Sequence, residues 1–198
     1  MITGLLFSIL LAQTGFANEI TPPAQVKSCV ACHDIDGGAA DDDSIPKIAS
    51  LGDTYFRKEL SAFSKKLRHE NMAPMMYTVI SPSTKDSDLD IIVAYFAQQN
   101  QKPSTAADSA LAAKGKIIYE QGLPAKGVMP CTACHGDKGL ADFNIPRIAG
   151  QNIGYQLAQF EAYTKQTRQD LDSKMMTKMI LNLSIDELTA LANYINSL

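Results

Sequence analysis

Two short stretches, Cys29-Val30-Ala31-Cys32-His33 and Cys131-Thr132-Ala133-Cys134-His135, decide the fold of this chain. Each is a C-x-x-C-H motif, and together they use all four cysteines and two of the three histidines. In this motif two thiols form thioether bonds to a haem, and the imidazole that follows binds the iron. We therefore predict two covalently attached haem c groups, with His33 and His135 as the proximal iron ligands.

Other roles for paired cysteines fit the sequence less well. A disulfide framework does not need a histidine after each pair, and a chain of this length can bury a core without disulfides. A zinc ribbon places its C-x-x-C pairs roughly 15–20 residues apart, whereas about a hundred residues separate them here. A thioredoxin-like site needs one pair within a βαβ unit, which the sequence does not predict.

The first 17 residues carry no charged side chain, are mostly apolar and end in small residues at Gly15 and Ala17. This pattern predicts a signal peptide over residues 1–17, although no Lys or Arg precedes the apolar run. The run is short for a transmembrane helix, and an uncleaved anchor is the alternative. The net charge of −3 argues against nucleic acid and anionic membrane surfaces as partners.

The second half of the chain repeats the first. Ile45-Pro46-Lys47-Ile48-Ala49 returns one hundred residues later as Ile145-Pro146-Arg147-Ile148-Ala149. Matched single residues follow at the same offset, Arg68 with Arg168 and the pair Met75-Met76 with Met175-Met176. The offset is 102 at the C-x-x-C-H motifs, so only small insertions separate the copies. Such self-similarity indicates two copies of one domain.

Each copy is expected to be helical, because apolar residues recur at helical spacing. The apolar stripes are Phe56, Leu60, Phe63 and Leu67; Leu89, Ile92, Val93 and Phe96; Ile153, Leu157, Phe160 and Tyr163; and Ile185, Leu188, Leu191, Ala192 and Ile195. Ser184 and Glu187 predict a capping box before the last stripe. The predicted fold is all-α, with tandem domains at 18–100 and 111–198 joined by a polar linker at 101–110.

With its C-x-x-C-H motif, proline-containing loop, methionine and closing helix, each half resembles a class I cytochrome c. Two fused halves in a chain of this size resemble the dihaem cytochrome c4 family. The resemblance runs from Ala24 to Leu198 and is strongest in the second half, which has Gly115 and Tyr119 before its motif. The first half lacks that pattern, and Ser50-Leu51 replaces the expected Gly-Gln. The resemblance implies two cytochrome c domains, each wrapped around one covalently bound haem.

The resemblance also implies the residues around each iron. Pro46 and Pro146 would accept a hydrogen bond from the proximal imidazoles. His69 is the only other histidine, so two bis-histidine irons are excluded, and we expect His69 to be solvated. A methionine thioether is the alternative sixth ligand, and it raises the reduction potential.

The family's methionine ligand corresponds to Met176, and its repeat partner is Met76. Met72 and Met75 remain alternatives at the first haem. The neighbouring methionines, Met72, Met75, Met175 and Met179, are otherwise expected to be packing residues. Lys47 and Arg147 are expected either to pair with a haem propionate or to be exposed.

A cytochrome c4-like chain is expected to carry single electrons in the periplasm rather than to catalyse a reaction. The resemblance implies a donor of the quinol–cytochrome c reductase type and a terminal oxidase or other acceptor, each met by transient docking. Membrane association would come through a partner complex or an uncleaved N-terminal segment. One alternative is the dihaem subunit of a flavoprotein dehydrogenase of the sulfide dehydrogenase type. Another is a dihaem peroxidase or thiosulfate-oxidising enzyme.

Overall fold

The computed structural model describes residues 21–39, 42–70, 72–81, 84–104, 106–141, 144–168 and 173–198. The predicted signal peptide, residues 1–17, lies outside these ranges. Within them the secondary structure is helical, with two isolated β-bridges and no strand, which agrees with the all-α prediction. Among the same residues, no helix is both long enough and apolar enough to cross a membrane.

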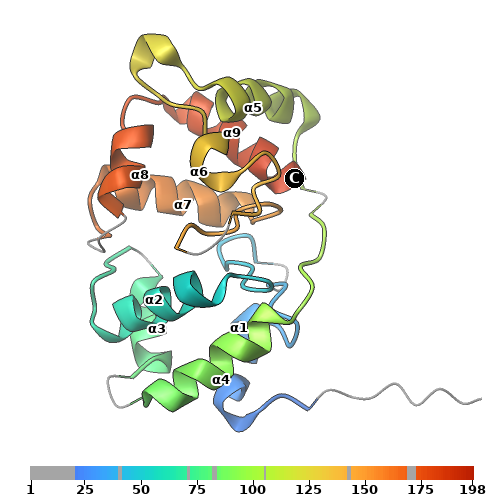
Figure 1. Ribbon diagram of the computed structural model, residues 1–198, viewed down its shortest axis with the longest axis vertical. Helices are drawn as coiled ribbons and strands as arrows, with labels where there is room; N and C mark the ends of the chain where they lie inside the picture. The colour runs from blue at the N-terminus through green and yellow to red at the C-terminus, as the bar shows by residue number, and fades with distance from the viewer. Residues whose placement is uncertain are drawn as a thin grey trace, which may run out of the picture.

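The helices form two lobes stacked along the long axis of the molecule (Figure 1). The first lobe contains η1 (Ala24–Val26), α1 (Lys27–His33), α2 (Asp53–Ser64), α3 (Ala73–Val79) and α4 (Asp86–Ala97). The second contains α5 (Ser109–Gln121), η2 (Pro124–Lys126), α6 (Thr132–His135), α7 (Ile153–Thr164), α8 (Ser173–Ile180) and α9 (Ile185–Ser197). The segment after α4 runs along one side of the molecule to reach α5.

The core of the first lobe lies between α2 and α4. Phe56, Leu60 and Phe63 of α2 are buried, as are the four apolar residues predicted for α4. The rings of Phe56 and Phe96 meet edge to face, with centroids 6.2 Å apart. Leu67 was expected to extend the α2 stripe but is exposed, because the helix ends at Ser64.

The core of the second lobe is built on the crossing of α5 and α9. A Cβ atom at Gly115 would lie 2.0 Å from the carbonyl oxygen of Ala190, so only glycine allows the two backbones to approach this closely. One turn later the buried Tyr119 meets the ring of Tyr194 edge to face, with centroids 5.3 Å apart. The glycine and the aromatic residue thus set the packing of this helix pair.

The start of α9 confirms one prediction and corrects another. The hydroxyl of Ser184 accepts a hydrogen bond from the backbone N–H of Glu187, whose carboxylate accepts one from the backbone of Ser184. This is the predicted capping box. Ile185 was expected to belong to the apolar stripe, but it is 70% exposed, because the helix begins there and this residue points away from the core.

The first lobe replaces the long α5 with a short segment. Val26 of η1 is fully buried, and η1 packs on α4 as α5 packs on α9. The first lobe therefore covers its closing helix with a single turn, which explains how it folds without the Gly115 and Tyr119 pattern.

Candidate haem-binding sites

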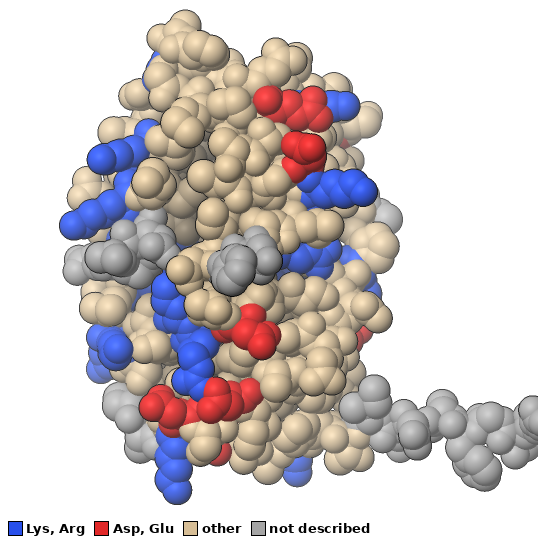
Figure 2. Space-filling view, in the orientation of Figure 1, with Lys and Arg blue, Asp and Glu red and all other residues tan. Residues whose placement is uncertain are grey.

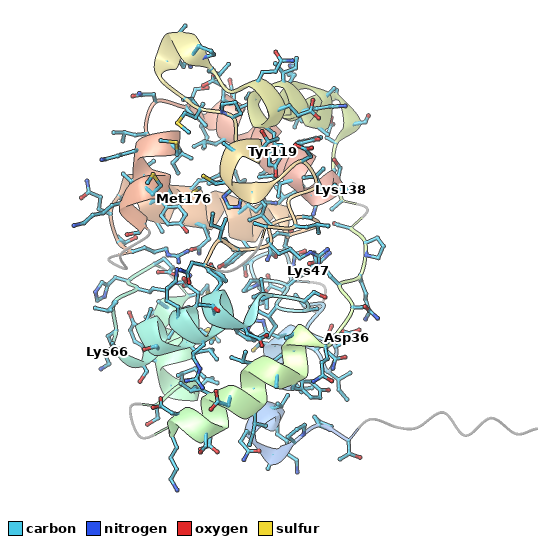
Figure 3. All side chains as sticks on the ribbon, viewed as in Figure 1. Asp36, Lys47, Lys66, Tyr119, Lys138 and Met176 are labelled. Carbon is cyan, nitrogen blue, oxygen red and sulfur yellow. The ribbon has the colours of Figure 1, made fainter. Side chains whose placement is uncertain are left out.

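One cavity of about 960 Å³ runs through both lobes. It brings together the predicted attachment residues, proximal ligands, loop prolines and methionines of both repeats: Cys29, Cys32, His33, Pro46, Met76, Cys131, Cys134, His135, Pro146 and Met176. Figure 3 places Met176 within the upper lobe and Lys47 near the junction of the lobes. The two predicted sites are therefore adjacent.

Both proximal histidines have the same hydrogen-bond geometry. His33 is the last residue of α1, and its Nδ1 lies 2.9 Å from the carbonyl oxygen of Pro46. His135 ends α6, and its Nδ1 lies 3.1 Å from the carbonyl oxygen of Pro146. A carbonyl oxygen only accepts, so Nδ1 carries the proton and Nε2 keeps its lone pair for a metal. Burial lowers the pKa of both histidines, which favours this neutral form.

None of the four cysteines is in a disulfide. Burial raises the pKa of the Cys131 thiol to about 11 and also raises the pKa of Cys29. All four cysteines line the cavity, as covalent attachment of a porphyrin there requires.

The methionines of α3 and α8 divide into two matched pairs. Met76 and Met176 are partly buried and pack against the cores of their own lobes. Met75 and Met175 line the cavity rim and are 53% and 60% exposed. Met75 and Met175 are thus outside the protein core of either lobe, although both line the cavity that bound haem would fill.

The basic residues after the loop prolines differ from one another. Lys47 is buried, and its ammonium donates to the carbonyl oxygen of Lys102 at 3.2 Å, so it is not an exposed charge. Arg147 lines the cavity, and its buried Nε makes no hydrogen bond to any described residue. An unpartnered buried guanidinium N–H fits an anionic ligand such as a haem propionate. The residues present thus fit the predicted haem.

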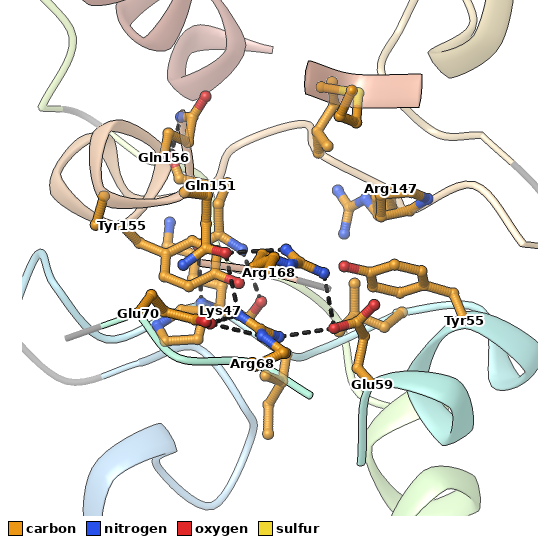
Figure 4. Close-up of a pocket in the computed structure, with 18 of the residues that line it drawn as sticks. Lys47, Tyr55, Glu59, Arg68, Glu70, Arg147, Gln151, Tyr155, Gln156 and Arg168 are labelled. Carbon is orange, nitrogen blue, oxygen red and sulfur yellow. Dashed lines mark hydrogen bonds and ion pairs between the residues drawn. The ribbon is translucent and has the colours of Figure 1, made fainter. Parts of the chain in front are cut away.

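Sequence reasoning missed a group of buried polar residues between the two sites. Arg68, Arg168, Glu59 and Gln159 line the same cavity, and each arginine donates to both Glu59 and Gln159 across the junction of the lobes. Figure 4 shows Glu59 between the two arginines. The signal was the exact return of Arg68 as Arg168 in the repeat. His69, beside Arg68, is exposed as expected.

Comparison with known proteins agrees with this geometry. The Cytochrome c family model matches residues 24–100 and 112–198. The chain is 32% identical to cytochrome c4 of Pseudomonas aeruginosa over 203 residues, covering 98% of each chain. It is 27% identical over 170 residues to a thiosulfate dehydrogenase electron acceptor of Stutzerimonas stutzeri, covering 84% of this chain and 77% of the relative.

The arrangement of the lobes also matches a solved structure. The crystal structure of reduced recombinant cytochrome c4 from Pseudomonas stutzeri superposes with a TM-score of 0.80 at 28% identity. The match covers 88% of this chain and 95% of the other. The chain therefore belongs to the dihaem cytochrome c4 family within the cytochromes c, and it is an electron carrier with two covalently attached haem c groups.

Proposed function

We propose that this protein is a periplasmic shuttle that takes single electrons from a quinol–cytochrome c reductase and delivers them to a terminal oxidase or another acceptor. The observation that carries the proposal is the single cavity that joins two matched sites. One site can then face a donor while the other faces an acceptor. Bound haem supplies the one-electron iron couple, and the protein holds each group in a fixed, largely apolar environment.

We further propose His33 and Met76 as the axial ligands of the first iron, and His135 and Met176 as those of the second. The hydrogen bonds from His33 to Pro46 and from His135 to Pro146 support the proximal assignments. Only two pairs of methionines match across the repeat, and of these Met76 and Met176 are the more buried. Met72 has an aspartate as its counterpart, Asp172, which weighs against Met72 as a shared ligand.

Docking would use small surfaces beside the sites. Met75 and Met175 present apolar side chains to solvent at the rim of the cavity, on α3 and α8. Charges of both signs are interspersed on the face shown in Figure 2, with wide uncharged areas between them. Small apolar contacts without one dominant charge suit brief encounters with more than one redox protein.

Residues 1–17 would direct export to the periplasm and then be removed, and the domains would span 18–100 and 111–198 with a linker at 101–110. The mature N-terminus, measured by mass spectrometry of the holoprotein from a periplasmic fraction, tests the cleavage. An uncleaved chain in the membrane fraction would support anchoring by the N-terminal segment instead.

A second candidate function is that of an electron acceptor for a periplasmic dehydrogenase. It is favoured by the relatives that are named thiosulfate dehydrogenase electron acceptors. A dihaem subunit of a flavoprotein sulfide dehydrogenase belongs to the same class of function. In each case the chain would receive electrons from a partner enzyme rather than oxidise the substrate itself.

Stopped-flow electron transfer separates these candidates. Oxidised holoprotein is mixed with a purified quinol–cytochrome c reductase and quinol, with a thiosulfate dehydrogenase and thiosulfate, or with a sulfide dehydrogenase flavoprotein and sulfide. The shuttle proposal expects the fastest reduction by the reductase and rapid reoxidation by a terminal oxidase. Fast reduction by one dehydrogenase, with slow reduction by the reductase, would overturn it in favour of the acceptor role.

A further inference from the structure

Two buried arginines lie side by side where the lobes meet. Arg68 and Arg168 face each other in an antiparallel β-bridge, and the N–H of His69 donates to the carbonyl oxygen of Thr167 at 2.7 Å. The two arginines occupy the same position in the two repeats. An antiparallel contact between equivalent positions places a local two-fold axis between them.

The side chains obey the same symmetry. The Nη1 of Arg68 donates to Glu59 of its own lobe at 2.7 Å, and its Nη2 donates to Gln159 of the other lobe at 3.0 Å. The Nη1 of Arg168 donates to Gln159 of its own lobe at 2.9 Å, and its Nη2 donates to Glu59 of the other lobe at 2.8 Å. Each arginine therefore bridges the same two positions, 59 and 159, with the same atoms.

Charge breaks this symmetry at positions 59 and 159. Glu59 and Gln159 are 5% and 7% exposed and equivalent in the repeat, yet one is a carboxylate and the other an amide. Other positions around the axis keep their character. Tyr55 returns as Tyr155, and Lys47 returns as the cationic Arg147. Glu70, which accepts from Nε of Arg68 at 2.6 Å, has an acidic counterpart in the sequence.

The carboxylate of Glu59 belongs to the wall of the cavity that contains both haem sites (Figure 4). Its Oε2 accepts from both arginines, while its buried Oε1 has no hydrogen-bond partner among the described residues. A charge in a buried site is weakly screened by solvent and acts on neighbouring groups over some distance. Since positions 59 and 159 are separate points related by the axis, a charge on only one of them distinguishes the two haems.

We propose that Glu59 determines which of the two haems the electron prefers. Its buried negative charge would lower the reduction potential of one haem more than that of the other. A negative charge stabilises ferric over ferrous iron and so lowers the reduction potential, most at the nearer haem. The inference rests on the two covalent haems of the family and does not depend on which proteins donate or accept electrons.

The repeat supplies an unusually sharp test. E59Q places an amide at both positions, and Q159E places a carboxylate at both. Each variant therefore removes the charge difference between positions 59 and 159, although the two change the net charge in opposite directions. The double variant E59Q/Q159E restores one carboxylate on the opposite side of the axis. Gln159 already shows that a glutamine oxygen accepts from both arginines, so E59Q is expected to fold.

The measurement is a spectroelectrochemical titration that resolves both haem potentials in each holoprotein. Their difference gives the equilibrium constant for moving one electron between the haems. We expect both potentials to rise in E59Q and to fall in Q159E. The equilibrium constant should nevertheless change in the same direction and by the same factor in both, and by the square of that factor in the double variant.

The matched control is E161Q on α7, two residues beyond Gln159. Glu161 is exposed and pairs with Lys165, so the same chemical change should leave the equilibrium constant unaltered. The proposal is overturned if the single variants move the equilibrium constant in opposite directions, or if the double variant leaves it at the wild-type value. If the shuttle proposal is wrong, the rates of electron transfer with the partner proteins will differ from those expected, but the equilibrium constant between the haems will not. The failure of one proposal can therefore be told from the failure of the other.

Discussion

Gln151 binds both backbone polar groups of Lys47 across the junction of the lobes. Its Oε1 accepts from the backbone N–H of Lys47 at 2.9 Å, and its Nε2 donates to the Lys47 carbonyl oxygen at 2.9 Å. The counterpart of Gln151 in the first repeat is Leu51, whose side chain has no polar atom and cannot make the equivalent hydrogen bonds to the second lobe. Only the second lobe therefore supplies a side chain for this pair of hydrogen bonds between the lobes.

Replacing Gln151 with leucine, the residue of the other repeat, should weaken the junction. Two buried backbone groups of Lys47 would lose their partners, at a cost of about 1–3 kcal/mol for each unsatisfied group. We expect Q151L to lower the denaturant midpoint and to separate the unfolding of the two lobes, as followed by the Soret band. Q121L, the same change at an exposed position at the end of α5, is the control. Equal midpoints for Q151L and Q121L would contradict the interpretation of this contact.

Gly115→Ala should destabilise the second lobe strongly. The added Cβ would lie 2.0 Å from the carbonyl oxygen of Ala190, which is backbone and cannot rotate away. We expect a loss of about 3 kcal/mol or more from overpacking, against a gain of about 1 kcal/mol in helix propensity. Thermal unfolding measures the effect. K114A, at the exposed position one residue earlier, should change stability by less than about 0.5 kcal/mol, and a mild G115A would contradict the close helix crossing.

The sequence predicted the parts of this fold that depend on local pattern. The C-x-x-C-H motifs identified His33 and His135, and helical periodicity located α2, α4, α7 and α9. The sequence did not predict that Met75 is more exposed than Met76. Neighbouring residues on a short helix differ in burial only through what the helix packs against, and that is a tertiary property.

Local sequence patterns also did not predict which charged residues are buried. Arg68 and Glu70 flank an exposed histidine, which in sequence suggests a solvated turn. They are buried because the equivalent segment of the other lobe lies against them. Buried ionic groups need partners, and Gln159, a partner of Arg68, is 91 residues away. The repeat offered the available clue, since a charged residue kept at equivalent positions suggests a shared environment.

The two closing helices differ at their first turn in a way that predicts a stabilising change. The N-cap of α9 is Ser184, within a capping box, whereas the N-cap of α4 is Lys85, which makes no capping hydrogen bond. Their backbone angles are nearly the same, φ −73° and ψ 151° for Lys85 against φ −73° and ψ 164° for Ser184. K85S should therefore stabilise the first lobe by about 1 kcal/mol. K85A is the control, and an equal gain in both variants would show that capping is not the cause.

The methionine assignments make a last prediction that can be counted per haem. The weak near-infrared charge-transfer band from methionine to ferric iron should have two equivalents in the wild-type holoprotein. M176A and M76A should each retain one, with a lower potential at the altered haem, because a thioether ligand raises the reduction potential. M175A and M75A are matched controls, since these neighbours point to solvent and should leave both equivalents in place. If M76A retains both equivalents while M75A or a Met72 variant loses one, then Met75 or Met72, rather than Met76, is the ligand of the first iron.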